Sequence, residues 1–293
     1  MAIMCICCAF RLGARNGRAV CLSGVLRTAN PAIAADAKLI CCNPVTSQCA
    51  NSSFRPLPGP QGCGKTPVMP EQMSLAMTDF TTRRRMMVDT QIRPSDVTSF
   101  PIIDAMLTVP REPFVPDSQR EAAYAGENLV LADGRVMLEP RTLAKILESL
   151  DITGTDLVMD IGCGYGYSAA VVARLAQAVV AIEDDEMMAN DAPELLSDVG
   201  ADNAILHTGA LADGAAEHGP YDVILVQGGV GELPQTVENQ LKDGGRIACI
   251  FMDGALGVVR VGYKSSNGIN WRFAFNAGAP VLPGFEKQSS FAL

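Results

Sequence analysis

Short apolar runs alternate with helical segments over much of the second half of the chain. Val, Ile, Leu and Ala dominate five of these runs, which predict buried strands at 156–162, 178–184, 204–209, 222–228 and 246–253. Segments with helical spacing lie between the first three runs, and another precedes the fifth. Continuous apolar strands separated by helices are typical of a parallel sheet that is covered on both faces.

The regions on either side follow other patterns. Residues 257–265 and 270–278 read as two successive strands around SNGI, the arrangement of an antiparallel hairpin. Upstream, 78–92 and 140–150 predict helices, joined through a proline-broken connector. We therefore predict an α/β fold with a doubly wound, mostly parallel seven-stranded sheet that ends in an antiparallel hairpin, preceded by a helical segment over about 78–150.

The first 72 residues show no sustained helical or alternating period. We expect residues 1–76 to be an unstructured leader, or translation from a start upstream of the native one, and residues 77–293 to form the folded domain; a transit peptide is the alternative. Residues 59–66, GPQGCGKT, match the phosphate-binding pattern G-x-x-x-x-G-K-[ST]. Prolines on both sides oppose the strand and the helix that such a loop needs, so we interpret the match as chance.

Charge and cysteine content exclude several classes of function. Residues 1–72 hold 7 of the 23 basic and 2 of the 32 acidic residues, which leaves a net charge of −14 on the rest. Such an acidic body repels phosphate backbones, so we expect no nucleic-acid partner. No run of 18 apolar residues occurs, so we expect no membrane span. Cys163 and Cys249 lie in apolar runs, which favours a reducing, cytoplasmic location, and neither Cys5 and Cys8 nor the two histidines form a metal-binding motif.

A glycine-rich loop follows the first predicted strand and leads directly into a helix. It consists of Gly162, Cys163, Gly164, Tyr165 and Gly166. Glycines let the backbone turn sharply and approach a ligand, with the flanking residues contributing their main chain. The second strand ends in Glu183 and Asp184, where a carboxylate can accept hydrogen bonds from the two hydroxyls of a ribose.

Two classes of cofactor fit this loop. A dinucleotide needs G-x-G-x-x-G/A, which Gly164, Gly166 and Ala169 satisfy, whereas S-adenosylmethionine suits [DE]-x-G-x-G-x-G, which begins at Asp160. A carboxylate at that position would repel a pyrophosphate and attract an ammonium and a sulfonium. The sequence therefore favours an S-adenosylmethionine-dependent methyltransferase, with a nicotinamide-dependent oxidoreductase as the alternative.

Several stretches outside and inside the loop are similar to one family. They are MVDTQIRPSDV, AMLTVPREPFVP, the pair Ala123-Tyr124, MDIGCGYGYSAAVVA and QLKDGGRIACI. Through them residues 78–250 resemble the protein-L-isoaspartate O-methyltransferase family, and VPREPFVP is the most specific element. The resemblance implies S-adenosylmethionine as cofactor and, as partner, a protein or peptide whose isoaspartyl carboxylate is methylated. A carboxylate is already ionised at neutral pH, so no catalytic His or Cys is expected.

The resemblance also suggests site residues beyond the loop. They are Leu138, Pro140 and Tyr124 on the substrate side and Ala210 and Gln227 on the cofactor side. Three positions depart from the family. Leu138 replaces a serine that contacts the substrate, Ala210 replaces an acid that holds the adenine side, and Gly126 replaces an aspartate that follows the Ala-Tyr pair.

Three functions are compatible with these residues. The first is an isoaspartyl carboxyl methyltransferase, which the shared stretches favour. The second is a methyltransferase on the same scaffold with another acceptor, which Leu138 and Ala210 favour. The third is a module without catalytic activity that binds S-adenosylmethionine or has lost it.

Overall fold

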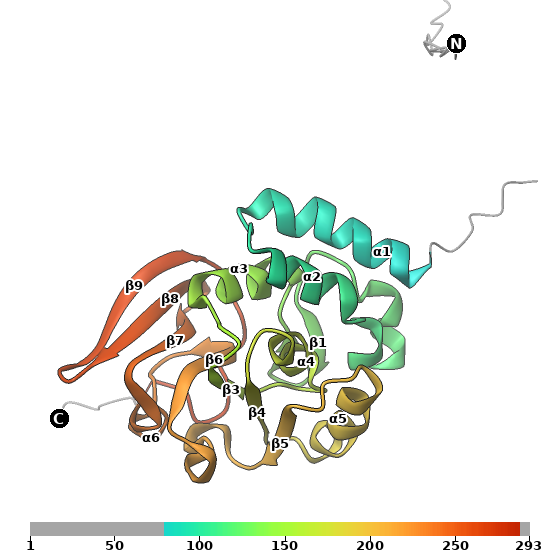
Figure 1. Cartoon of the computed structure of the whole chain (residues 1–293). Coiled ribbons are helices and arrows are strands. Elements are labelled where there is room, and N and C mark those ends of the chain that lie inside the picture. The colour runs from blue at the N-terminus through green and yellow to red at the C-terminus, as the bar shows by residue number, and fades with distance from the viewer. Residues whose placement is uncertain (1–78, 288–293) are drawn as a thin grey trace, which may run out of the picture. The chain divides into compact units, whose positions relative to one another are not determined.

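The computed structural model describes residues 79–287 (Figure 1). The expected leader over 1–76 and the phosphate-loop match at 59–66 lie outside the described residues. Within 79–287 no helix has both the length and the apolar character needed to cross a bilayer. Cys163 and Cys249 are both buried and free.

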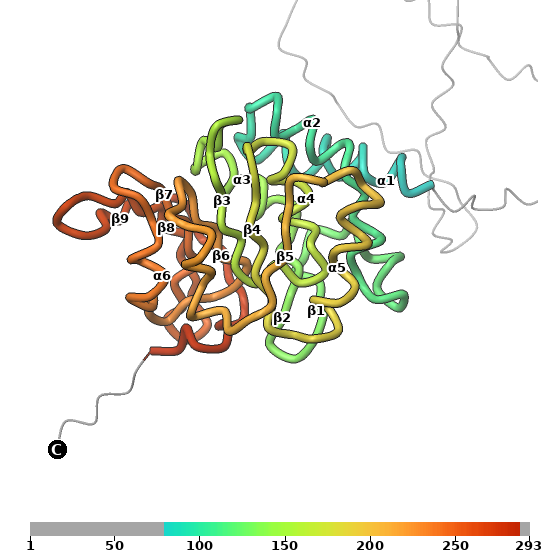
Figure 2. Tube along the Cα trace, turned by 60° about the horizontal axis from the view of Figure 1, so that its bottom comes forward, coloured from blue at the N-terminus to red at the C-terminus, as the bar shows by residue number. Residues whose placement is uncertain are grey.

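A seven-stranded sheet forms the centre of the structure, with strand order β5-β4-β3-β6-β7-β8-β9 (Figures 1 and 2). The first five strands in this order pair in parallel, and β8 and β9 complete the sheet antiparallel to their neighbours. The predicted fold class is confirmed. Its strands are β3 (Leu157–Ile161), β4 (Ala178–Glu183), β5 (Ala204–Thr208), β6 (Tyr221–Val230), β7 (Leu241–Asp253), β8 (Leu256–Ser265) and β9 (Gly268–Asn276).

Alternate residues of the central strand face opposite layers of the core. Val158 of β3 belongs to the apolar cluster that holds Leu143 and Ala169, whereas Met159 and Ile161 belong to a second cluster. This burial on both faces explains why β3 reads as a continuous apolar run. The helices are α1 (Phe80–Met87), α2 (Phe100–Thr108), α3 (Pro140–Leu150), α4 (Tyr167–Ala173), α5 (Glu186–Asp198) and α6 (Gln235–Asn239).

The helical segment before the sheet is less regular than its pattern predicts. Helix α1 continues as a π-helix over Val88–Ile92 and a 3₁₀ turn over Arg93–Ser95. Four further 3₁₀ segments occupy connections, at Glu112–Phe114, Asp117–Ala122, Leu211–Asp213 and Ala216–His218. Figure 1 shows α1, α2 and α3 gathered beyond one side of the sheet.

A small hairpin in front of α3 was not predicted. Strands β1 (Leu129–Ala132) and β2 (Arg135–Met137) pair antiparallel and form a separate two-stranded sheet. Gly134 in the turn has φ +69°, a left-handed conformation that glycine adopts without strain. The dipeptide Asp133-Gly134 is a known hairpin signal, so the sequence did carry the information.

Candidate active site

The glycine loop follows β3. The next strand along the chain, β4, pairs with one edge of β3, and β6 pairs with the other, so the strand order reverses at this point. Ligands of doubly wound sheets bind at this point, beyond the carboxyl ends of the strands. Gly162, Gly164 and Gly166 have φ of +78°, +60° and +98°. Residues other than glycine rarely adopt such φ values, so this backbone conformation favours glycine at all three positions.

Asp160 is the last residue but one of β3, beneath the loop, and is completely buried. Its two carboxylate oxygens accept hydrogen bonds from Ser168 Oγ at 2.6 Å and from Gln227 Nε2 at 2.9 Å. Burial raises the pKa of the Asp160 carboxyl to about 6, although both hydrogen bonds oppose the shift. The structure therefore joins two of the predicted cofactor residues, Asp160 and Gln227, in one hydrogen-bonded group.

Glu183 ends β4 on the other side of the loop, and its side chain has no exposed surface. The backbone N–H of Gly164 donates to its Oε2 at 2.6 Å, and the N–H groups of Asp184 and Asp185 donate to its Oε1 at 3.1 Å. Burial raises the pKa of the Glu183 carboxyl, and the guanidinium of Arg135 opposes that rise. The loop and the end of β4 are thus fixed to each other through one carboxylate.

Arg135 of β2 forms a buried ion pair with this carboxylate. Its Nη1 and Nη2 lie 2.7 and 2.6 Å from the two oxygens of Glu183, and Nη1 also donates to Asp184 Oδ1 at 2.5 Å. Sequence reasoning missed Arg135 as a site residue because the hairpin that carries it was not predicted.

A small cavity separates the loop from β2 and α3. It has a volume of about 10 Å³, roughly the room that one water molecule needs. Leu138, the substrate-side candidate, is buried in its wall. The residues around it are Val136, Met137, Leu138, Leu143, Gly162, Cys163, Tyr167, Ser168 and Gln227.

The other two substrate-side candidates lie apart from this cavity's lining. Pro140 is buried as the first residue of α3. The Tyr124 hydroxyl accepts hydrogen bonds from the Arg111 backbone N–H at 3.1 Å and from Arg84 Nε at 3.2 Å, and it donates to Glu112. Tyr124 thus ties the N-terminal helices together, and its role toward a substrate stays a prediction.

Arg111 connects the two regions. This buried side chain donates from Nε to the carbonyl of Ala123 at 2.7 Å and from Nη2 to the carbonyl of Leu138 at 2.5 Å. Its guanidinium carbon also lies 4.8 Å from the centre of the Tyr167 ring. The most specific stretch of the sequence, VPREPFVP, therefore holds the Leu138 segment in place.

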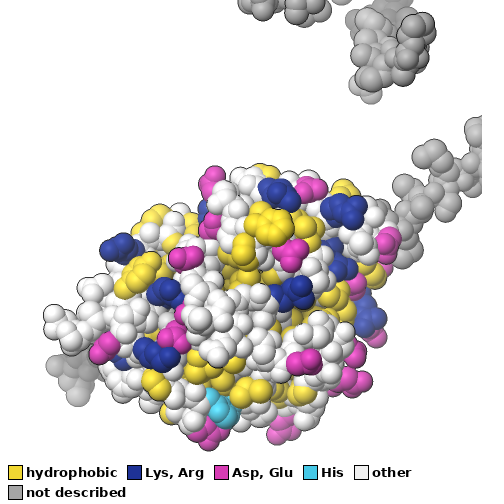
Figure 3. Space-filling view, viewed as in Figure 1, with side chains coloured by type: hydrophobic (Ala, Val, Ile, Leu, Met, Phe, Trp, Pro, Cys, Tyr) yellow, Lys and Arg dark blue, Asp and Glu magenta, His cyan; other side chains and the backbone are white. Residues whose placement is uncertain are grey.

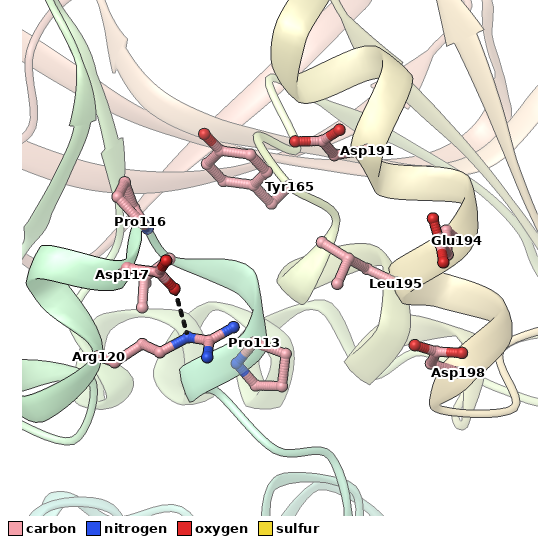
Figure 4. A pocket seen from close by; sticks show the side chains of 10 residues that line it. Pro113, Pro116, Asp117, Arg120, Tyr165, Asp191, Glu194, Leu195 and Asp198 are labelled. Atoms are coloured by element: carbon pink, nitrogen blue, oxygen red, sulfur yellow. Dashed lines mark ion pairs between the residues drawn. The ribbon is translucent and has the colours of Figure 1, made fainter.

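Two further cofactor-side candidates, Tyr165 of the glycine loop and Ala210 after β5, are more exposed than the loop glycines. The Tyr165 side chain lines a groove of about 320 Å³ between the Asp117–Ala122 turn and α5 (Figure 4). Ala210 is exposed at the start of the 3₁₀ turn after β5. Among the described residues, neither side chain forms a hydrogen bond with the carboxylate of Asp160 or Glu183. At the third departure from the family, a Cβ on Gly126 would lie 3.4 Å from the Gln91 side chain.

Both histidines of the chain meet near the end of β5. His207 Nδ1 and His218 Nε2 each lie 3.3 Å from Glu217 Oε1. Their sequence spacing gave no metal motif, because the fold brings them together from β5 and a separate 3₁₀ turn.

Comparison with known proteins identifies the family. The model of the family "Protein-L-isoaspartate(D-aspartate) O-methyltransferase" matches residues 82–267. The chain belongs to this family. It is 37% identical over 169 residues to a protein-L-isoaspartate O-methyltransferase of Roseiflexus castenholzii, which covers 58% of this chain and 77% of the relative. It is 33% identical over 205 residues to protein-L-isoaspartate O-methyltransferase 2 of Pelobacter propionicus, which covers 67% and 91%.

Solved structures agree with this assignment. A protein-L-isoaspartate O-methyltransferase superposes with a TM-score of 0.61 and 27% identity, over 69% of this chain and 67% of that one. A putative family member from Plasmodium falciparum, in complex with S-adenosyl-L-homocysteine, has a TM-score of 0.58 and 17% identity over 69% and 97%, and it shows the shared fold. Family membership decides between the two cofactor classes in favour of S-adenosylmethionine.

The donor set of the loop fits this cofactor. The three glycines of the loop carry no side chains of their own, and the carboxylate of Glu183 accepts two parallel N–H donors from a single planar group. It can therefore also accept the two hydroxyl donors of a ribose. Asp160 lies beneath the loop, and an ionised carboxylate there would attract the positive charge of a sulfonium.

Proposed function

We propose that the chain methylates the side-chain carboxylate of isoaspartyl residues in proteins, with Gly162, Gly164, Gly166 and Glu183 holding S-adenosylmethionine. The observation that carries this proposal is the glycine loop fixed to Glu183 inside a family match that spans 82–267. The cofactor supplies a methyl group activated by a positively charged sulfur. The protein's own contribution is to orient the acceptor carboxylate and to exclude water.

The residues around the cavity are consistent with a reaction that needs no base. The residues that line the cavity include no histidine and no carboxylate, and the Asp160 carboxylate behind them accepts hydrogen bonds from Ser168 and Gln227. An ionised acceptor attacks without losing a proton. The test is transfer of labelled methyl to an isoaspartyl peptide, with the same peptide containing ordinary aspartate as the matched control. Equal labelling of the two peptides, or of neither, contradicts the proposal.

Leu138→Ser is expected to raise the rate of transfer to an isoaspartyl peptide by about tenfold. Leu138 shares the cavity with Gly162 and Cys163 and cannot donate a hydrogen bond, whereas a serine hydroxyl can donate one to a charged acceptor. One such bond is worth about 1.5 kcal/mol or more. The measurement is kcat/KM with labelled cofactor.

Leu138→Ala is the matched control, because it removes the same bulk without supplying a hydroxyl. Both variants create a cavity at a buried leucine and should lose about 2–5 kcal/mol of stability, so each is checked for folding by circular dichroism. A gain in the alanine variant as large as in the serine variant would mean that space, not the hydroxyl, limits the wild type.

A second candidate is a methyltransferase with a different acceptor. The apolar Leu138 favours it, because the carboxylate of an isoaspartyl side chain needs a polar partner. Labelled cofactor offered to small acids, proteins and RNA tests this candidate. A calorimetric titration that detects no cofactor binding would instead favour a module that has lost the cofactor.

A further inference from the structure

Arg135 holds the carboxylate that a nucleoside would need. The guanidinium donates to both oxygens of Glu183, at 2.7 and 2.6 Å, and the two side chains are 6% and 0% exposed. The backbone N–H groups around Glu183 already use part of its remaining accepting capacity. A ribose cannot donate to the same oxygens in the same directions while the guanidinium stays in place.

The hairpin that carries Arg135 also covers the glycine loop. A Cβ on Gly164 would lie 2.6 Å from Leu131 Cδ1 of β1, and a Cβ on Gly162 would lie 3.2 Å from Arg135 Nη2. The same Cβ on Gly162 would also lie 3.2 Å from Leu282 Cδ1, in the segment after β9. The space left between the loop, β2 and α3 is the cavity of about 10 Å³, far too small for a nucleoside.

We propose that Arg135 is a gating residue that competes with the cofactor for Glu183, and that the β1–β2 hairpin is the lid it holds closed. This inference rests on the proposed function, because it takes Glu183 as the ribose-binding carboxylate. The forked N–H groups of a guanidinium supply two parallel donors to a carboxylate, as two neighbouring hydroxyls do. When the cofactor binds, its two ribose hydroxyls therefore replace the guanidinium N–H groups of Arg135 as donors to Glu183.

Asp184 can pair with the guanidinium after the cofactor has displaced it from Glu183. Arg135 Nη1 already lies 2.5 Å from Asp184 Oδ1, and the Asp184 side chain is 29% exposed, so this second pair reaches the surface. A movement of β2 away from the loop can keep the Arg135–Asp184 pair while it releases Glu183. The open state is a minority, and the apparent affinity for the cofactor falls by the fraction of molecules that are open.

The test is calorimetric titration with S-adenosylhomocysteine of the full chain and of Arg135→Gln. We expect the variant to bind at least tenfold more tightly, because a neutral amide releases Glu183 at lower cost than a guanidinium. Arg135→Lys, which keeps the charge and loses the fork, should fall between the two. Arg141→Gln, at a 44% exposed arginine on α3, is the matched control and should leave the affinity unchanged.

Two readouts separate gating from folding and from the proposed function. Hydrogen exchange at 129–137 should rise when S-adenosylhomocysteine binds the wild type, whereas a purely structural arginine predicts no rise. If the wild type binds and Arg135→Gln binds with equal or lower affinity while folded, the gating proposal is wrong. If the wild type, Arg135→Gln and Arg135→Lys all fail to bind S-adenosylhomocysteine, then both the cofactor site at Glu183 and the gate that depends on it are wrong.

A separate observation concerns His207, Glu217 and His218. Their ligand atoms all lie within 4.8 Å of one another, and both nitrogens lie 3.3 Å from Glu217 Oε1. Neighbouring ligands of a tetrahedral zinc ion, bound at about 2.0–2.1 Å, are separated by about 3.3 Å. Figure 3 shows histidine atoms at the surface beside acidic side chains, so an ion could reach them.

We infer that this trio binds a divalent cation of the zinc type, with water completing the shell. Two imidazoles and one carboxylate are a ligand set that zinc accepts, whereas magnesium prefers oxygen ligands alone. The full chain also carries eight cysteines before residue 64, so total zinc binding alone is ambiguous. The test therefore compares the number of zinc ions bound by the wild type with the number bound by a variant in which both histidines are replaced.

The expected result is that the wild type binds one more equivalent of zinc than His207→Ala with His218→Ala. Both histidine ring signals in the proton NMR spectrum should also shift on adding zinc and not on adding magnesium; the chain has only two histidines, so each signal is resolved. An equal stoichiometry in the two proteins, or ring signals that do not move, would overturn this inference.

Discussion

Glu183→Ala is expected to lower the free energy of unfolding by about 3–5 kcal/mol. The substitution leaves the Arg135 guanidinium, 6% exposed, without its principal partner, and the ion pair with Asp184 restores only part of the loss. It also removes the acceptor of the Gly164 N–H, which joins the loop to β4. Removing one member of a buried ion pair costs more than the pair itself contributes. Chemical denaturation of the two proteins measures the difference.

A comparison with an exposed pair makes this expectation specific. Asp89 and Arg93 lie one helical turn apart and are 56% and 52% exposed, so Asp89→Ala should cost no more than about 0.5 kcal/mol. The double variant Glu183→Met with Arg135→Met should recover most of the loss, because an apolar pair leaves no buried charge. A double variant as unstable as Glu183→Ala would show that the carboxylate acts through the backbone and not through Arg135.

Asp160→Asn is expected to be about 3 kcal/mol more stable than the wild type at pH 8, and to differ by less than about 1 kcal/mol at pH 4. The pKa of the Asp160 carboxyl is about 6 in the folded chain against an ordinary value of 3.8. The folded chain therefore binds this proton more tightly than the unfolded chain does. The stabilisation that comes from protonated Asp160 is complete below pH 3.8 and is lost as the pH rises through about 6.

Urea unfolding of both proteins across this range gives the comparison, and the difference between them cancels the titration of the other groups. Asparagine can keep one hydrogen bond to Gln227 and another to Ser168, so packing is preserved. A difference that stays constant from pH 4 to pH 8 would show that Asp160 titrates normally. Cofactor affinity should fall in this variant, since the charge beneath the loop is what the cofactor requires.

The parts of the fold that depend on local pattern could be predicted from the sequence. The strands of the parallel sheet are buried on both faces, so each appears as an uninterrupted apolar run, and the glycine loop was located because strand, acid and glycines occur together. The β1–β2 hairpin was missed because its strands have only four and three residues, too short for an alternating pattern to stand out. Its Asp133-Gly134 turn was the available signal.

Contacts between distant segments could not be predicted. Arg135 lies 48 residues from Glu183 along the chain, and the fold brings them into contact. His207 and Glu217 come from a strand and a later 3₁₀ turn, so no spacing announces them as a group. Tyr124 was predicted from resemblance to lie on the substrate side, which stays a prediction, whereas the hydrogen bonds of its hydroxyl with Arg84, Arg111 and Glu112 had no signal in the sequence. Sequence patterns report local structure, and these groups form only through the tertiary fold.

The loop that we propose to hold the methyl donor contains a thiol, Cys163, which is 6% exposed. A thiol attacks electrophiles as the thiolate, and burial together with the negative charges of Asp160 and Glu183 raises the pKa of Cys163 well above its usual value. The same acids that we propose to attract a cationic donor therefore keep this thiol protonated. A thiol that stays protonated reacts slowly with a methyl donor, so we expect little self-methylation at Cys163.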